Sequence, residues 1–133
     1  MRKGMVIFMT KEDRSRLSLG YAFRFGTMSH KGCGNLARII KRFVESDSSA
    51  DTANYKQMIA EVAEERKIQP NSLKRSIQRY IDAGWKHGSA NNWKHFIDWN
   101  QDTPPNADTA IRLLCGTVDK YLDECCERVG LEK

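Results

Sequence analysis

YKQMIAEVAEERKIQPNSLKRSIQRYIDAGWK, residues 55–86, is the most strongly patterned stretch of this 133-residue chain. Apolar residues recur every three to four positions on both sides of residues 68–71, which predicts two amphipathic helices with a short connection. Pro70 disfavours helix at the residue before it, and Asn71 is a good N-cap for the second helix. That helix should stop near Gly88. Two helices joined in this way predict a helix-turn-helix.

The packing expected of a helix-turn-helix is also present in this stretch. Ala63 is a small residue where the two helices should cross closely, and Leu73 and Ile77 bury one face of the second helix. The glycine usual in the turn is absent, and Lys67-Ile68 stands there. The first helix should run to about Arg66. A separate expectation is that Trp85 lies in the core and joins the second helix to Trp93 or to the last helix.

The opposite face of the second helix is polar. Its residues are Ser72, Lys74, Arg75, Gln78, Arg79 and Asp82. We expect Arg75 and Gln78 to read bases, because arginine bonds a guanine edge and glutamine an adenine edge. Phosphate contacts are expected mostly from the remaining polar and basic residues, Ser72, Lys74, Arg79 and Lys86. The predicted partner is therefore double-stranded DNA, contacted in the major groove.

The charge distribution supports a nucleic-acid partner. The net charge is +5, but residues 1–46 carry +7 and residues 67–95 carry +5. Residues 47–66 carry −3 and residues 96–133 carry −4. Two basic segments separated by an acidic one predict a basic face, which suits nucleic acid or a membrane surface. The alternative is a basic protein with no such partner.

No membrane or secretory segment is expected. The longest apolar run, Met5–Met9, has five residues. A membrane span needs about 18 residues and a signal-peptide core about 7. We therefore expect a cytoplasmic protein that makes no membrane contact.

Residues 1–31 are patterned differently from the rest. Apolar residues alternate with other residues from Leu17 to Phe25, which predicts a half-buried strand. Met5–Met9 could pair with it as a β-hairpin. The alternative, which the sequence does not separate from the first, is a mobile basic arm.

Residues 32–133 are predicted to form one helical domain. A helix is expected at 34–46, and Thr52 or Asn54 should cap the helix that follows. Trp93 marks a short helix, and Asn106 should cap a long last helix that ends before Gly130. The predicted fold class is all-α, a compact bundle of five to six helices that contains the helix-turn-helix.

Catalytic and metal-binding patterns are missing from the sequence. It contains no phosphate-binding loop motif, no serine-hydrolase motif and no zinc-protease motif. The four cysteines form no C-x-x-C pair, and the vicinal pair Cys125-Cys126 is poorly spaced to chelate one ion with His30 and Cys33. We expect no enzymatic activity, no cofactor and no metal.

The sequence resembles the C-terminal effector domain of the master response regulator of sporulation initiation in endospore-forming bacteria. The similarity runs without a gap through VAEERKIQPNSLKRSI, residues 62–77, and continues through AGWKHG, residues 83–88. It resumes at Pro105-Asn106 and the last helix as far as Leu122, so it covers about residues 32–122.

The resemblance implies a six-helix DNA-binding domain whose helix Ser72–Trp85 enters the major groove. Arg75 matches a DNA-contacting arginine of the family. Lys74, Gln78 and Arg79 depart from it, so the family's target sequence does not transfer. The resemblance also implies head-to-tail dimers on tandem sites, and contact with the sigma factor of RNA polymerase through about Asp82–Asp98.

A second departure concerns the phosphoryl-accepting receiver domain that the family places before the effector. Only 31 residues precede the similar region here, whereas a receiver needs about 120 residues. The expected function is a sequence-specific double-stranded DNA-binding protein, a transcription regulator without a receiver domain. The alternative is a non-enzymatic interaction protein, such as an accessory or inhibitor protein of a mobile genetic element, that reuses the helical fold.

Overall fold

The computed structural model describes residues 10–26 and 30–131, with side chains up to Cys125. The described residues contain helices and no strand. The elements are α1 (Lys11–Ser18), the 3₁₀ helix η1 (Tyr21–Phe25), α2 (Lys31–Ser46), α3 (Tyr55–Arg66), α4 (Pro70–Gly84), the π-helical turn η2 (Trp85–Ser89), α5 (Ala90–Phe96) and α6 (Ala107–Leu131). The predicted all-α bundle is confirmed.

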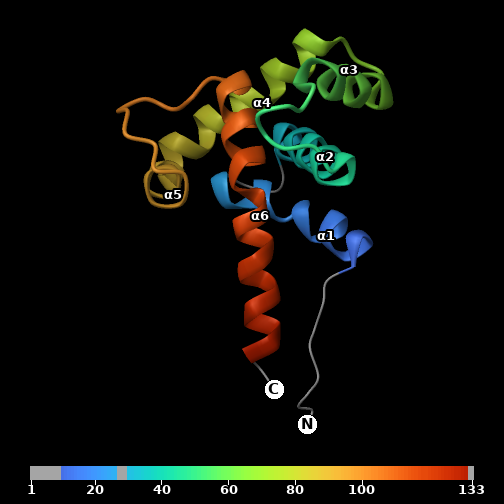
Figure 1. Cartoon of the computed structure of the whole chain (residues 1–133). Helices are drawn as coiled ribbons and strands as arrows, with labels where there is room; N and C mark the ends of the chain where they lie inside the picture. The colour runs from blue at the N-terminus through green and yellow to red at the C-terminus, as the bar shows by residue number, and fades with distance from the viewer. Residues whose placement is uncertain (1–9, 27–29, 132–133) are drawn as a thin grey trace.

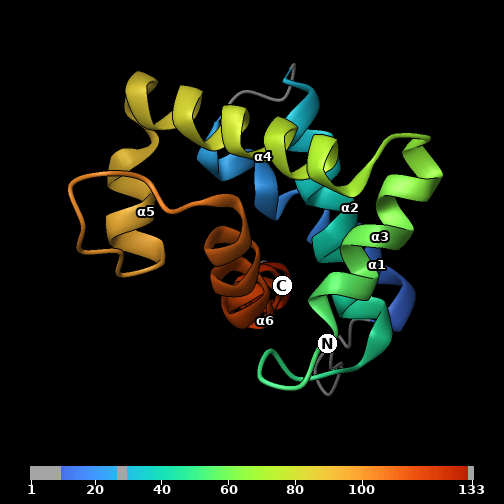
Figure 2. The ribbon, with the colours of Figure 1, turned by 90° about the horizontal axis from the view of Figure 1, so that it is seen from above.

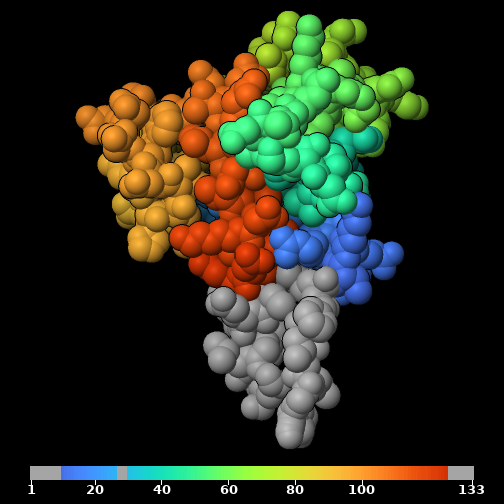
Figure 3. Space-filling view, in the orientation of Figure 1, coloured from blue at the N-terminus to red at the C-terminus, as the bar shows by residue number. Residues whose placement is uncertain are grey.

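Helix α2 is the centre of the packing, because it contacts α1, α3, α4, α6 and η1. Helix α4 passes behind the upper part of α6 and leads from α3 on one side to α5 on the other (Figure 1). Seen from above, α4 lies along one edge of the molecule (Figure 2). The space-filling view shows α5 and the loop after it as a lobe beside α6 (Figure 3). No helix in the described ranges combines the length and apolar character needed to cross a bilayer.

Residues 17–25 are not a strand, so the hairpin prediction is wrong in its described part. Thr10 caps α1 by accepting a hydrogen bond from the Asp13 backbone N–H, and the Asp13 side chain accepts one in return. The next segment is η1, whose buried residues Tyr21, Ala22 and Phe25 belong to the common core. Positions 21, 22 and 25 lie on one side of a helical turn, so the alternation of apolar residues in the sequence does not reflect a strand. The proposed partner strand, Met5–Met9, lies outside the described residues.

Helix α1 is held by polar contacts. The residues it buries are serines, Ser15 and Ser18. The Ser15 hydroxyl donates to Glu45 of α2 at 2.6 Å, and Arg14 lies 2.8 Å from the Asp119 carboxylate of α6. Hydrogen bonds and ion pairs therefore fix α1, in contrast to the apolar packing of the other helices.

The predicted helix caps were partly correct. The Asn54 side chain accepts from the Gln57 backbone N–H at 3.1 Å, so Asn54 caps α3. Asn106 likewise accepts from Thr109 N–H at 2.8 Å and caps α6. The prediction for Asn71 was wrong, because α4 begins at Pro70. Gln69 takes the N-cap position, and proline suits the first helical position, where a missing N–H costs nothing, so the helix starts two residues earlier than predicted.

The core tryptophan is Trp93 of α5, whereas Trp85, which was expected in the core, is only partly buried. The Trp93 ring lies 4.4 Å from that of Phe25, measured between centroids. The prediction extended α4 as a regular helix through Trp85. Trp85 itself keeps helical backbone angles, with its N–H bonded to the Ile81 carbonyl, and the backbone leaves helical angles at His87 and Gly88. Trp85 packs against the core without being enclosed by it.

Helices α2 and α4 cross closely at Gly32. A side-chain carbon built on Gly32 would lie 2.1 Å from the Ser76 carbonyl oxygen. Asn35, one turn later, donates from its amide to the Ser76 hydroxyl at 2.7 Å. Gly32 was expected in a loop before the helix. It is the residue that allows α4 to lie against α2.

Candidate nucleic-acid interface

Helices α3 and α4 are joined by Lys67, Ile68 and Gln69. The Lys67 backbone is left-handed, with φ of 59°. The Ile68 N–H donates to the Ala63 carbonyl at 3.0 Å, and the Lys67 N–H donates to the Glu64 carbonyl at 3.1 Å. This is a Schellman C-cap with lysine at the position that usually holds glycine. Ala63 is buried between the helices, as predicted. The result is a pair of helices joined by a tight turn of three residues.

Three cationic side chains lie on the outward side of this unit. Arg75 and Arg79 are exposed and one helical turn apart on α4, and Lys86 is exposed in η2 just beyond it. None of the three forms a salt bridge with another described residue. Arg75 donates to the Ser72 hydroxyl at 3.3 Å, which adds Ser72 to the same side. We name Arg75, Arg79 and Lys86 the outward strip.

Lys74 is not part of the outward strip. Its Nζ lies 3.4 Å from the Asp108 carboxylate of α6. It borders a groove between α3, α4 and α6 whose floor includes Ile59 and Ile111. Its charge is therefore partly compensated within the protein, and it faces α6.

Gln78 also faces α6, and both the oxygen and the nitrogen of its side-chain amide are hydrogen-bonded within the protein. Its Oε1 accepts from the Ala107 backbone N–H at 2.6 Å. Its Nε2 donates to the Pro105 carbonyl at 3.3 Å and to the Asp82 carboxylate at 3.1 Å. Each end of the amide has partners inside the protein, so Gln78 has no free edge to offer a base. We do not retain it as a base-reading residue.

The end of α4 differs from the predicted regular helix. Within η2, Gly88 has φ of 114°, which a residue with a side chain rarely adopts. The backbone leaves helical angles at His87 and Gly88, so Lys86 stands at the end of the helical path that begins in α4. Residues 82–98, which the resemblance assigns to polymerase contact, form the end of α4, η2, α5 and the start of the next loop.

Two cations that the sequence reasoning missed lie on α2. Lys31 and Arg38 are exposed, and Lys31 directly precedes the residue at which α2 crosses α4. Arg42 on the same helix is compensated by two carboxylates of α3, Glu61 and Glu65. The sequence feature that pointed to these two cations was the strong positive charge of residues 1–46. Sequence alone did not show that Lys31 would lie beside α4, or that Arg38 would lie near Leu19 and Glu65.

The described residues hold no metal-binding cluster, and two of their cysteines are buried. No group of three or more histidine, cysteine or acidic side chains there is placed to hold a metal ion. Cys33 and Cys115 are buried, and burial raises the pKa of the Cys115 thiol to about 12. A thiol of that pKa is not a nucleophile at neutral pH.

Comparison of the chain with protein-family models, with curated proteins and with solved structures gives no match. The functional argument therefore depends on the geometry of α4 and the residues around it.

Proposed function

We propose that this protein binds double-stranded DNA in a sequence-specific manner and regulates transcription, with α4 as the reading helix. The observation that carries the proposal is the outward strip. Two of its cations, Arg75 and Arg79, lie on the second helix of the predicted helix-turn-helix and the third, Lys86, lies just beyond it, and none of the three pairs with a described carboxylate. A helix in this position enters the major groove, and its N-terminal residues reach base edges.

The roles of the residues follow from their positions. Arg75 lies near the start of α4, where a guanidinium can bond a guanine edge with two donors. Arg79 lies one turn later. Lys86 lies past the end of the helix, where a phosphate contact is expected. Lys31, at the start of α2, extends the cationic surface beside α4 and would contact a backbone phosphate. The resemblance to the sporulation effector domain agrees with this assignment at Arg75.

The test is selection from a random duplex library at a stated salt concentration, followed by two single variants. Arg75→Ala should cost about 1–3 kcal/mol at the preferred site and reduce discrimination at one base pair. Lys86→Ala should weaken binding to all sequences equally and lower the salt slope by about one phosphate. Lys120→Ala, which removes an exposed cation from α6, is the matched control and should leave both quantities unchanged.

Two results would contradict the proposal. One is the absence of any duplex preference at about 100 mM salt, where cation-driven binding should persist. The other is an Arg75→Ala protein that stays folded and keeps the full margin of its preferred site over random DNA. Either result would favour the interaction protein as the function of this fold.

A further inference from the structure

A groove of about 420 Å³ lies between α3, α4 and α6. Seen from above, α3 and α6 lie on the same side of α4 (Figure 2). Lys74 borders the groove, and it lies about 100° around α4 from Arg75 and about 140° from Arg79, because successive helical residues are about 100° apart. The groove therefore opens on a different side of α4 from the outward strip.

The surface that this groove presents is mainly carbon. Ile59 and Tyr55 are each only 6% exposed, so they form its bottom. The apolar surface within reach of a ligand comes mostly from Ala60 and Pro70, which are exposed, and from the methylene stems of the lysines at the rim. An apolar side chain placed here would leave water on contact with these groups.

Cations surround the carbon surface. Lys56 and Arg112 are exposed, and neither forms a salt bridge with another described residue. The Arg112 guanidinium lies 4.5 Å from the centre of the Tyr55 ring, which holds it at the rim. Lys74 adds a third cation, and Asp108 is the one carboxylate among the described residues that line the groove. The rim therefore has a net positive charge and favours an acidic partner.

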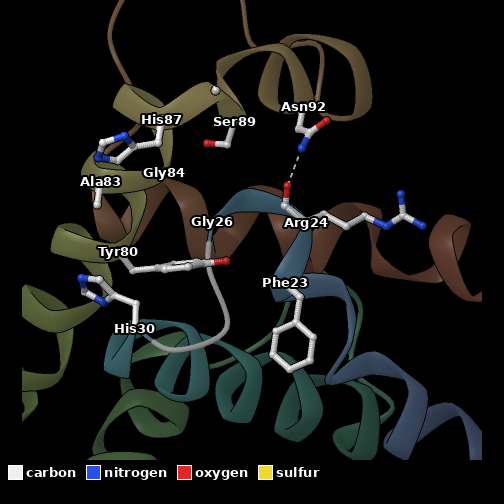
Figure 4. A pocket seen from close by; sticks show the side chains of 11 residues that line it. Phe23, Arg24, Gly26, His30, Tyr80, Ala83, Gly84, His87, Ser89 and Asn92 are labelled. Atoms are coloured by element: carbon white, nitrogen blue, oxygen red, sulfur yellow. Dashed lines mark hydrogen bonds between the residues drawn. The ribbon is translucent and has the colours of Figure 1, made fainter.

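A second cavity, of about 460 Å³, lies between α4, η2 and η1 and lacks this arrangement (Figure 4). Tyr80 is buried there, and Gly26 packs against its ring. His30 and His87 lie on opposite sides of that ring, so the two imidazoles do not converge on one ligand. The groove between α3, α4 and α6 combines carbon surface with uncompensated charge.

We propose that this groove binds a segment of a partner protein in which an apolar side chain is flanked by carboxylates. The apolar side chain lies over Ala60 and Pro70, and the carboxylates face Lys56 and Arg112. A nucleic-acid backbone would suit the cations, but its phosphates would gain nothing from the carbon surface between them. The proposal goes beyond the proposed function, because it requires no DNA and holds whether or not α4 reads bases.

The test begins with selection of peptides by the full chain from a phage-displayed library of random linear sequences. Recovered peptides should carry aspartate or glutamate on both sides of a large apolar residue. The tightest of them is then synthesised with a fluorescent label, and its affinity is measured by fluorescence polarisation. Replacement of its apolar residue by serine, or of its carboxylates by amides, should each weaken binding about tenfold.

Two variants locate the binding site. Lys56→Glu reverses one charge of the rim, and it should fold because an acidic residue suits the first turn of a helix. Ala60→Phe fills the groove from an exposed position of α3. Each should weaken binding of the peptide about tenfold. Lys94→Glu on α5 and Glu64→Phe on α3 make the matched changes outside the groove and should keep the affinity of the parent.

Selection that recovers no acidic peptide would overturn the proposal. Parental affinity for the peptide in either Lys56→Glu or Ala60→Phe would also overturn it. A random-sequence DNA duplex is the remaining competitor, and it should leave the peptide bound to the Arg75→Ala protein. Displacement by that duplex would assign the groove to nucleic acid instead.

Discussion

The side-chain oxygen of Gln78 accepts a hydrogen bond from the backbone N–H of Ala107 at 2.6 Å. The first residue of α6 is thus held by a side chain of α4, 29 positions earlier in the sequence. The opposite end of the same amide donates to the Pro105 carbonyl at 3.3 Å. One side chain therefore fixes the proposed reading helix against the longest helix of the molecule.

Gln78→Ala should destabilise the protein by about 1–3 kcal/mol, because it leaves the Ala107 N–H without its partner. Chemical denaturation measures this change. The base preference found by duplex selection should be the same as in the parent, since Gln78 faces α6. A variant with unchanged stability and a changed preference at one base pair would restore Gln78 as a base-reading residue.

Trp93→Ala should cost about 3–5 kcal/mol, as truncation of a fully buried aromatic residue does. Trp85→Ala should cost about 1–2 kcal/mol, because that side chain is only partly buried. Thermal or urea melts of the two variants make the comparison. Trp93→Phe keeps most of the packing on Phe25 and should lie between Trp93→Ala and the parent. Equal losses at the two tryptophans would contradict the assigned burial.

Lys67→Gly should stabilise the protein by about 0.5–1 kcal/mol, because glycine adopts the left-handed backbone without steric cost. Ala60→Gly is the matched control. It places glycine on an exposed, regular part of α3, and it should cost about 1 kcal/mol. Denaturation midpoints measure both changes in stability. A Lys67→Gly protein less stable than the parent would mean that the backbone at position 67 is not left-handed.

Acid should weaken the contact between α1 and α2 through Glu45. A hydrogen bond from Lys41, and then one from Ser15, hold the pKa of the Glu45 carboxyl below its ordinary value of 4.5. A lowered folded-state pKa adds stability above the unfolded pKa, and that contribution is lost as the pH falls through the folded value. The contribution is about 0.5 kcal/mol or less, since the group is partly exposed.

The measurement is urea unfolding of the parent and of Glu45→Gln between about pH 6 and pH 3. The difference in stability between the two should shrink as the pH falls. Glu64→Gln on the exposed face of α3 is the control and should show no such trend. A Glu45→Gln difference that grows on acidification would have the wrong sign for this account.

Local periodicity was enough to predict most of the helices. The apolar spacing in residues 55–86 gave the end of α3 and the burial of Ala63 and Leu73, because a helix that buries one face must repeat near 3.6. Asn54 and Asn106 were predicted as caps because capping is a contact within one turn of the chain. These predictions depend only on neighbours in sequence.

The features that the sequence could not predict depend on contacts between residues far apart in the chain. Gln78 was expected to face DNA on helix position alone, and its partners come from a segment that no local pattern places beside it. Residues 17–25 alternate as a strand would, yet the capping box at Thr10 and the core contacts of Phe25 favour helix. How far Trp85 is covered depends on which segments pack around it in space, and no local pattern fixes that.

Helix α4 is anchored on three of its sides, by the core, by α2 through Ser76 and by α6 through Gln78. Positions 75, 79 and 86 contact no other helix through the hydrogen bonds or ion pairs of the described residues. Substitutions at these three positions can accumulate without disturbing the scaffold. Under the proposed function, changes at Arg75 and Arg79 would alter the base preference while the architecture stays constant, and a library limited to those two positions is the smallest one that tests this.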